Sequence, residues 1–321
     1  MKLLVNVIHA ALLAGGVLVT TLLASCGGGQ QVQAFAPGRL LVFGDETSVI
    51  EDVNNDAEGR KYTVNALKTD NVTLDCTSNP IWIQHLSLSF SLVLPQCNPT
   101  AVADPASRIY AHAGDKVADV AAQIDSHLQV DTFLDTDLVT VLAGANDILE
   151  QYVLYDGSNA DPLKAAVQAA GTALAAQVNR IALAGGKVLV STVPDLGLSP
   201  FAIAEDSTNA GRSALLTALT AAFNERLRAN IKNNGHLIGL LLADETVQAL
   251  VKSPSVYGLI NVTTAECDPA LAPSVELCTT LTLVTDGTAT NYLWADDRHL
   301  SPAGHKFLGQ AAVSRATRNP F

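Results

Sequence analysis

Basic residues are scarce in this 321-residue sequence, and their scarcity limits what the protein can bind. Lys and Arg number 19 against 31 Asp and Glu, which gives a formal net charge of −12. Binding to nucleic acid depends on clustered Lys and Arg side chains that neutralise phosphates. We therefore expect no nucleic-acid partner.

Motifs for bound metals and nucleotides are also lacking. The 5 cysteines form no CxxC pair and no Cys/His spacing typical of zinc. No glycine-rich phosphate loop follows a predicted strand. We therefore expect no cofactor. The hydrophobic content of 48%, by contrast, is too high for a disordered chain.

Only one long apolar run occurs, at the N-terminus, which argues against a protein with several membrane spans. Lys2 precedes apolar and small residues from Leu3 to Ala24, the pattern of a secretory signal peptide. The run closes with Leu23-Ala24-Ser25-Cys26, which resembles the bacterial lipobox. There the cysteine becomes the first mature residue and carries acyl chains. An uncleaved anchor helix with an incidental cysteine is the alternative.

This resemblance predicts a signal peptide over residues 1–25 and a lipidated Cys26 that begins a glycine-rich tether over 26–38. Several acyl chains anchor a protein stably, whereas a single chain is marginal. The residue after the cysteine is Gly27 and not an acidic residue, which by resemblance to lipoprotein sorting favours the outer membrane. We thus expect a bacterial cell-envelope protein whose membrane contact is its N-terminal lipid.

The four remaining cysteines suit an oxidising compartment. An even number of cysteines in an exported protein is consistent with disulfides. Three connectivities are possible, and pairing of nearest neighbours closes two short loops, Cys76–Cys97 and Cys267–Cys278. The first loop contains Pro, Ser, Thr and Asn, and the second contains Pro and Ser, which suggests surface insertions closed by disulfides.

Short apolar runs alternate with helical patterns after residue 38. Buried strands are predicted at four places, namely 39–43, 138–142, 187–190 and 237–242. Strands that alternate with helices imply a parallel sheet covered on both faces. The sequence therefore predicts one α/β domain over 39–321, with insertions near 70–105 and 253–290.

Three helices have clear sequence signals. Asp161 is predicted as an N-cap with Pro162 in the first turn, and this helix ends at Gly185-Gly186. A second helix is predicted over 212–231, and a last one begins near Ser301-Pro302.

Polar motifs follow the predicted strands, at the edge where functional groups gather in open α/β sheets. Gly44-Asp45-Glu46 follows the first strand and Gly144-Ala145-Asn146-Asp147 follows the second. Gly114-Asp115 lies between them, and Asp296-Asp297-Arg298-His299 precedes the last helix. In this order the four blocks resemble the GDSL, or SGNH, hydrolases. The likeness extends from about residue 39 to residue 315.

The resemblance implies a three-layer α/β/α sandwich of the flavodoxin-like kind and a set of catalytic roles. In that family a serine attacks an ester carbonyl, His takes its proton, and Asp orients the His. By this correspondence His299 is the base and Asp296 its orienter, while Gly114 and Asn146 donate to the oxyanion. Read without the family, Gly114 is a turn residue, Asn146 a helix cap, and the Asp/His pair a polar loop.

The sequence departs from the family at the nucleophile, because Glu46 stands where the family has serine. A carboxylate is already ionised near neutral pH and has no hydroxyl proton to lose. Its attack on an ester would give a reactive anhydride. We expect the Glu46 carboxylate to occupy the oxyanion hole and to accept hydrogen bonds from Gly114 and Asn146. Ser48 is the alternative nucleophile, two residues late.

Two further catalytic routes remain open from the sequence. Glu46 can act as a general base on water with His299 as the acid. Alternatively, Asp45, Glu46, Asp296 and His299 can converge on a metal, although no spacing motif supports this.

Three functions therefore compete. The first is a lipid-anchored hydrolase of acyl esters or acylated glycans. The second is a binding or scaffolding lipoprotein that keeps the cleft and has lost turnover. The third is a structural envelope protein, which the joint presence of His299, Asp296, Asn146 and Gly114 argues against.

Overall fold

A parallel five-stranded sheet forms the centre of the protein. The computed structural model describes residues 35–52 and 59–318. The strand order is β6-β1-β7-β8-β9, and every neighbouring pair is parallel. The sheet strands are β1 (Arg39–Gly44), β6 (Arg108–Ile109), β7 (Asp137–Leu142), β8 (Lys187–Ser191) and β9 (Ile238–Leu241).

Side chains alternate between the two faces of the sheet, and each face has its own apolar core. In β1, Leu41 and Phe43 belong to one buried cluster, whereas Leu40 and Val42 belong to the other. All four are fully buried. Strands buried on both faces are largely apolar, which is why β1, β7, β8 and β9 were evident in the sequence. The short strand β6 was not predicted, because it has only two residues and Arg108 is exposed.

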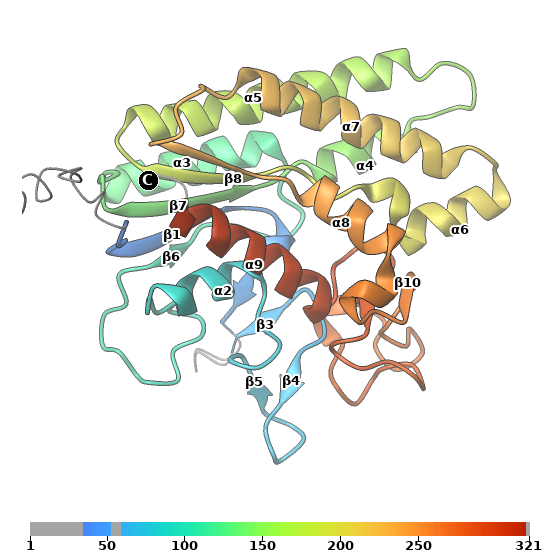
Figure 1. The fold of residues 1–321 in the computed structure, drawn as a ribbon, viewed down its shortest axis with the longest axis horizontal. Coiled ribbons are helices and arrows are strands. Elements are labelled where there is room, and N and C mark those ends of the chain that lie inside the picture. The colour runs from blue at the N-terminus through green and yellow to red at the C-terminus, as the bar shows by residue number, and fades with distance from the viewer. Residues whose placement is uncertain (1–34, 53–58, 319–321) are drawn as a thin grey trace, which may run out of the picture. The chain divides into compact units, whose positions relative to one another are not determined.

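Helices cover both faces (Figure 1). The first face carries α3 (Val117–Val130), α4 (Ala145–Val153), α5 (Asp161–Leu183) and α7 (Arg212–Asn230). The second face carries α2 (Trp82–Ser89), α8 (Ala243–Lys252) and α9 (Pro302–Arg318). The architecture is therefore a three-layer α/β/α sandwich, as the resemblance implied.

Smaller elements lie in the connections. They are β2 (Ile50–Glu51), β3 (Arg60–Lys61), β4 (Ala66–Leu67), β5 (Leu74–Asp75), β10 (Asn261–Ala265), β11 (Tyr292–Trp294) and α6 (Pro200–Thr208). Short 3₁₀ turns η1 to η4 cover Glu46–Ser48, Leu196–Leu198, Pro254–Tyr257 and Val275–Leu277.

The four predicted strands and three predicted helices are confirmed, with one correction at a helix start. Asp161 is the first residue of α5 and not its N-cap, which is Ala160. The Asp161 backbone N–H donates to the Asn159 side chain, so the upstream residue Asn159 provides a hydrogen-bond acceptor for the first N–H group of the helix.

Both disulfides are present in the predicted pairing, Cys76–Cys97 and Cys267–Cys278. The expectation that they close surface insertions is wrong for the first loop. That loop contains α2, whose Trp82, Ile83 and Leu86 are fully buried. Because α2 packs against α9, the first loop supplies part of a helical layer of the sandwich.

The predicted signal peptide, Cys26 and most of the tether lie outside the described residues. Among the residues that the structure does describe, none of the helices has the length and apolar character needed to cross a bilayer.

Candidate active site

Glu46 lies at the carboxyl end of β1, where the chain turns sharply out of the sheet. Gly44 has φ of 144°, and a Cβ there would lie 2.0 Å from the Leu142 carbonyl oxygen, so only glycine fits. Asp45 then caps η1 by accepting from the Thr47 N–H. This turn directs Glu46 to the edge of the sheet where the other motifs meet.

Asn146 reaches the same edge from the next strand. Gly144 is the N-cap of α4 and has φ of 124°, and a Cβ there would lie 2.3 Å from the Phe223 ring. Asn146 follows in the first turn of α4 and uses its Nδ2 group twice. It donates to Glu46 Oε2 and to the Asp115 carbonyl oxygen. The second bond fixes the orientation of the amide.

Gly114 is held beside these residues by a side chain of α3. Gln123 Nε2 donates to the Gly44 carbonyl at 2.8 Å and to Asp115 Oδ2 at 2.7 Å. This bridge joins the end of β1 to the Gly114–Asp115 turn. Gly114 has φ of 80° and points its N–H at Glu46.

The Asp/His pair is preorganised by the loop that precedes α9. Asp296 Oδ2 lies 2.7 Å from His299 Nδ1, and Asp296 Oδ1 accepts from the His299 and Arg298 backbone N–H groups. Thr63 anchors the next residue, because its hydroxyl donates to the Leu300 carbonyl. Asp296 therefore fixes the imidazole with Nε2 free to face the cleft.

These elements converge on the Glu46 carboxylate. Its Oε2 accepts from the Gly114 N–H and from Asn146 Nδ2, both at 2.9 Å. Its Oε1 lies 3.6 Å from His299 Nε2. The predicted contacts of Glu46 are thus confirmed, and Gly114, Asn146, Asp296 and His299 lie together as the four motifs implied.

The charges of the site stabilise one another. Burial opposes ionisation of Glu46, but the ion pair with His299 and the hydrogen bonds from Gly114 and Asn146 prevail and lower its pKa to about 2. Burial likewise opposes protonation of His299, but Asp296 and Glu46 prevail and raise its pKa to about 9. At neutral pH the pair is therefore Glu46 carboxylate and His299 imidazolium.

Asp45 is fully buried beside this pair. Burial and the Glu46 charge raise its pKa well above the ordinary value, so a neutral carboxyl is favoured next to the ionised one.

The structure bears on two alternatives to Glu46 chemistry, a nucleophile at Ser48 and a bound metal. Ser48 is fully buried and its hydroxyl accepts from the Trp82 indole N–H, so a nucleophile shifted to Ser48 is wrong. Its side chain faces the core because η1 has already turned away from the cleft. Among the described residues, no group of three or more His, Cys, Asp or Glu side chains is arranged to hold a metal ion.

The site opens into a cleft of about 560 Å³, a volume suited to a small ligand. Glu46, His299, Gly114 and Asn146 line this cleft. The second disulfide loop also lines it, with apolar surface from Pro269, Ala272, Pro273 and Val275 and polar groups from Ser274 and Glu276. The second predicted surface insertion is therefore, in part, a wall of the cleft.

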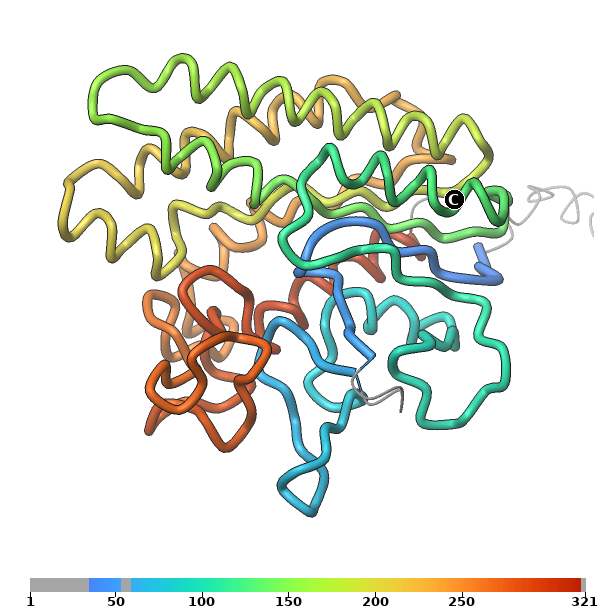
Figure 2. Tube along the Cα trace, turned by 180° about the vertical axis from the view of Figure 1, so that it is seen from behind, coloured from blue at the N-terminus to red at the C-terminus, as the bar shows by residue number. Residues whose placement is uncertain are grey.

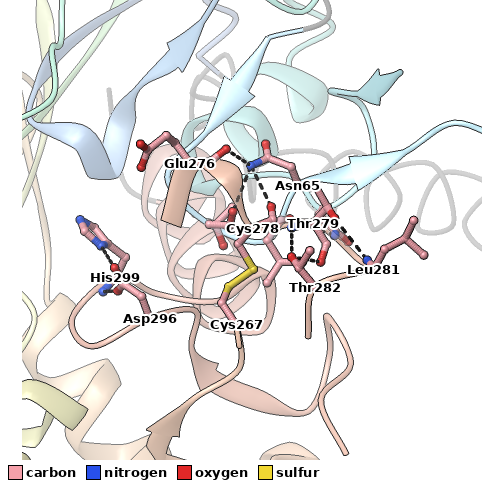
Figure 3. Close-up of a disulfide and its surroundings, with 12 residues drawn as sticks. Asn65, Cys267, Glu276, Cys278, Thr279, Leu281, Thr282, Asp296 and His299 are labelled. Atoms are coloured by element: carbon pink, nitrogen blue, oxygen red, sulfur yellow. Dashed lines mark hydrogen bonds and ion pairs between the residues drawn. A yellow bond between two sulfur atoms is a disulfide. The ribbon is translucent and has the colours of Figure 1, made fainter. Parts of the chain in front are cut away.

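Asn65 fastens this wall to the rest of the domain. Its Nδ2 lies within hydrogen-bond distance of the Glu276 and Cys278 carbonyls, and its backbone N–H donates to Cys278 at 2.9 Å (Figure 3). Figure 2 shows the same association, with the orange loops of the C-terminal part beside the light-blue segment that follows β3.

Sequence reasoning missed Asn65 and Tyr62. Tyr62 lines the cleft, its ring centroid lies 6.2 Å from that of His299, and its hydroxyl donates to Glu51. Neither residue belongs to a motif block. The only available signal was their position in a polar segment after the first strand, which does not indicate a site.

Comparison with known proteins gives one family match. Residues 107–312 match the family described as GDSL-like lipase/acylhydrolase. No curated protein matches the sequence.

Several solved structures are similar to this chain. A member of the lipolytic G-D-S-L family from Veillonella parvula is 13% identical, with 86% of this chain and 96% of that chain covered and a TM-score of 0.41. The acetylxylan esterase Axe2 from Geobacillus stearothermophilus is 14% identical, with coverage of 88% and 96% and a TM-score of 0.44. The α/β hydrolase LAE5 from the Lake Arreo metagenome is 17% identical, with coverage of 88% and 96% and a TM-score of 0.44.

Proposed function

Because the chain belongs to the GDSL-like lipase/acylhydrolase family, we propose that it is an envelope lipoprotein that binds acyl-ester or acylated-glycan ligands and does not hydrolyse acyl esters by a serine route. One observation carries this proposal. The carboxylate of Glu46 lies 2.9 Å from both donors that would otherwise hold the oxyanion of a tetrahedral intermediate.

Electrostatics oppose acyl transfer at this site. An ester carbonyl cannot reach Gly114 and Asn146 while a negatively charged oxygen accepts their hydrogen bonds. Even if the ester displaced Glu46, a second negative charge would develop beside the first. The donors therefore stabilise the protein's own anion and not a transition state.

The protonation state of His299 also opposes acyl transfer. A general base must be neutral to take a proton, whereas the pKa of His299 is raised to about 9 by Asp296 and Glu46 against the effect of burial. The serine route thus lacks its nucleophile, its vacant oxyanion hole and its neutral base.

Hydrolysis with Glu46 as general base is disfavoured by the same contacts. Burial alone would raise the pKa of Glu46, but the ion pair with His299 and the hydrogen bonds from Gly114 and Asn146 lower it to about 2. A carboxylate with so low a pKa takes a proton from water poorly.

Ligand binding is supported by the shape and lining of the cleft. Pro269, Ala272, Pro273 and Val275 offer apolar surface for an acyl group. Tyr62, Ser274 and Glu276 add polar groups at the same cleft, which suit a hydroxylated ligand such as a glycan.

Substitution of Glu46 by Ser tests the proposal directly. Glu46→Ser should raise p-nitrophenyl acetate hydrolysis over wild type by on the order of 100-fold or more, the scale of general-base catalysis. The new hydroxyl would face His299, both donors would be vacant, and loss of the carboxylate would lower the pKa of His299.

Two controls make this test decisive. Glu46→Ser/His299→Ala should lose the gained activity, and wild type should resist fluorophosphonate labelling. Efficient ester hydrolysis by wild type that is lost in His299→Ala would contradict the proposal. An unchanged rate in correctly folded Glu46→Ser would also contradict it.

A further inference from the structure

The two oxygens of the Glu46 carboxylate have different surroundings. Oε2 is held by the Gly114 N–H and by Asn146 Nδ2, both at 2.9 Å. Oε1 faces His299 Nε2 at 3.6 Å, and Glu46 lines the cleft. One oxygen is therefore immobilised in the oxyanion hole while the other lies on the side of the His299 imidazole.

This division matters for a carboxylate nucleophile. Attack on an ester carbonyl by Oε1 would give an anhydride, but attack on a saturated carbon gives a simple alkyl ester. In that alkyl ester, Oε2 becomes the carbonyl oxygen. It would already lie between the two donors that stabilise a tetrahedral oxyanion.

We propose that the protein opens epoxides, with Glu46 as the nucleophile, His299 as the acid and then the base, and Gly114 and Asn146 as the oxyanion hole for hydrolysis of the alkyl-enzyme ester. The activity goes beyond the proposed function, since neither a binding role nor the lack of acyl-ester hydrolysis implies it.

The first step forms the ester. Oε1 of Glu46 forms a bond to one epoxide carbon while the bond between that carbon and the ring oxygen breaks. The electron pair of the broken bond goes to the ring oxygen, which takes the proton from His299 Nε2. The products are a hydroxyalkyl ester of Glu46 and a neutral imidazole held by Asp296.

The second step consumes water. His299 Nε2 takes a proton from a water molecule whose oxygen bonds to Cδ of Glu46, and negative charge develops on Oε2 between Gly114 and Asn146. The intermediate collapses by breaking the bond between Cδ and Oε1. The diol leaves with Oε1 and takes the remaining proton of the water-derived hydroxyl on Cδ, so Glu46 is again a carboxylate and His299 keeps its proton as an imidazolium.

Proton balance selects epoxides over other alkyl electrophiles. A halide or sulfate leaving group needs no proton, so His299 would remain protonated and could not activate water. An epoxide oxygen needs a proton and thereby leaves His299 neutral for the second step. The raised pKa of His299, about 9, keeps that proton available at neutral pH.

The cleft can hold a small apolar epoxide. Its volume of about 560 Å³ and its wall of Pro269, Ala272, Pro273 and Val275 suit an aromatic or alicyclic group next to Glu46. Styrene oxide and cyclohexene oxide are therefore the probes.

The decisive experiment is a single turnover of wild-type protein, in excess over styrene oxide, in water enriched in the heavy isotope of oxygen. The mechanism transfers Oε1 to the diol and a water oxygen to Glu46. The diol should therefore contain no heavy oxygen. The tryptic peptide 40–60 should gain one heavy oxygen, located at residue 46 by fragmentation.

Matched variants separate the covalent route from background hydrolysis. Glu46→Gln should reduce diol formation to the buffer rate, whereas Glu225→Gln, an exposed glutamate on α7, should leave it unchanged. Intact disulfides and unchanged circular dichroism would show that Glu46→Gln is folded.

Three outcomes would overturn the proposal. The first is that wild type forms diol no faster than Glu46→Gln with both probes. The second is that heavy oxygen is found in the diol and none in the peptide. The third is that the peptide is labelled at a residue other than 46. Because the isotope experiment uses wild-type protein, its result does not depend on how a variant folds. Failure of the proposed function appears separately, in the ester assay of Glu46→Ser.

Discussion

Residue 46 determines the charge state of the whole site. A serine there would leave His299 paired with Asp296 alone, whereas Glu46 adds a second anion 3.6 Å from the imidazole. The three charges Asp296, His299 and Glu46 then form a line in which the cation lies between two anions. This arrangement explains why the pKa of His299 rises although burial opposes its protonation.

We predict that His299 titrates near pH 9 in wild type and at lower pH in Glu46→Gln, because the neutral amide no longer stabilises the imidazolium. NMR titration of the imidazole resonances would measure both values, with Glu225→Gln as the control that should match wild type. Equal pKa values in wild type and Glu46→Gln would show that Asp296 alone controls His299.

The same shifts predict how stability depends on pH. The pKa of His299 is raised from 6.5 to about 9, so its contribution is complete below 6.5 and is lost as pH rises through 9. The pKa of Glu46 is lowered from 4.5 to about 2, so its contribution is complete above 4.5 and is lost as pH falls through 2. Urea denaturation should therefore show a larger loss of stability from pH 6 to pH 9 in wild type than in Glu46→Gln.

At the scale of elements, the two disulfide loops serve different parts of the molecule. The Cys76–Cys97 loop carries α2 and so completes a helical layer against α9. The Cys267–Cys278 loop provides the apolar wall of the cleft and is fastened by Asn65. Loss of either disulfide should reduce stability, but only the second should disturb the cleft directly.

Paired substitutions of the cysteines by alanine test this difference. Each double variant should lose about 3 kcal/mol of unfolding free energy, the scale expected for loops of this length. In the Glu46→Ser background, only Cys267→Ala/Cys278→Ala should raise the KM for p-nitrophenyl esters, because its cleft wall is released. An equal KM increase in Cys76→Ala/Cys97→Ala would assign both effects to general loss of stability.

At the scale of the whole molecule, the sheet places its functional groups on one edge. Glu46 follows β1 and Asn146 follows β7, and these neighbouring parallel strands end side by side. The third group, His299, comes from the segment that precedes α9, and α9 belongs to the helical layer on the second face of the sheet. The cleft therefore depends on packing of both layers against one sheet.

The proposed N-terminal lipid anchor is tested on the full-length protein. If Cys26 carries acyl chains, expressed full-length protein should partition with membranes, and Cys26→Ser should be released or remain unprocessed. Intact mass of the N-terminal peptide would measure the modification, and Cys26→Ser is the matched control. An unmodified, uncleaved wild-type N-terminus would contradict the lipoprotein proposal.

Four of the five sheet strands and the set of site motifs were predictable from the sequence. The strands over 39–43 and 138–142 were predictable because both of their faces are buried and they are therefore apolar throughout. The contacts of Glu46 were predictable because four motif blocks in family order place Gly114, Asn146 and His299 around it. Both inferences use local patterns, which can be recognised in a single sequence.

The residues that form the rest of the cleft were not predictable, because they depend on contacts between distant segments. Asn65 meets Cys278 across 213 residues, and α2 enters the core from a loop whose composition resembles a surface. Ser48 was a nucleophile candidate by its hydroxyl alone, and packing against Trp82 buried it. Such contacts depend on how distant segments pack, and a local pattern of residue types does not encode which distant segment each residue will meet.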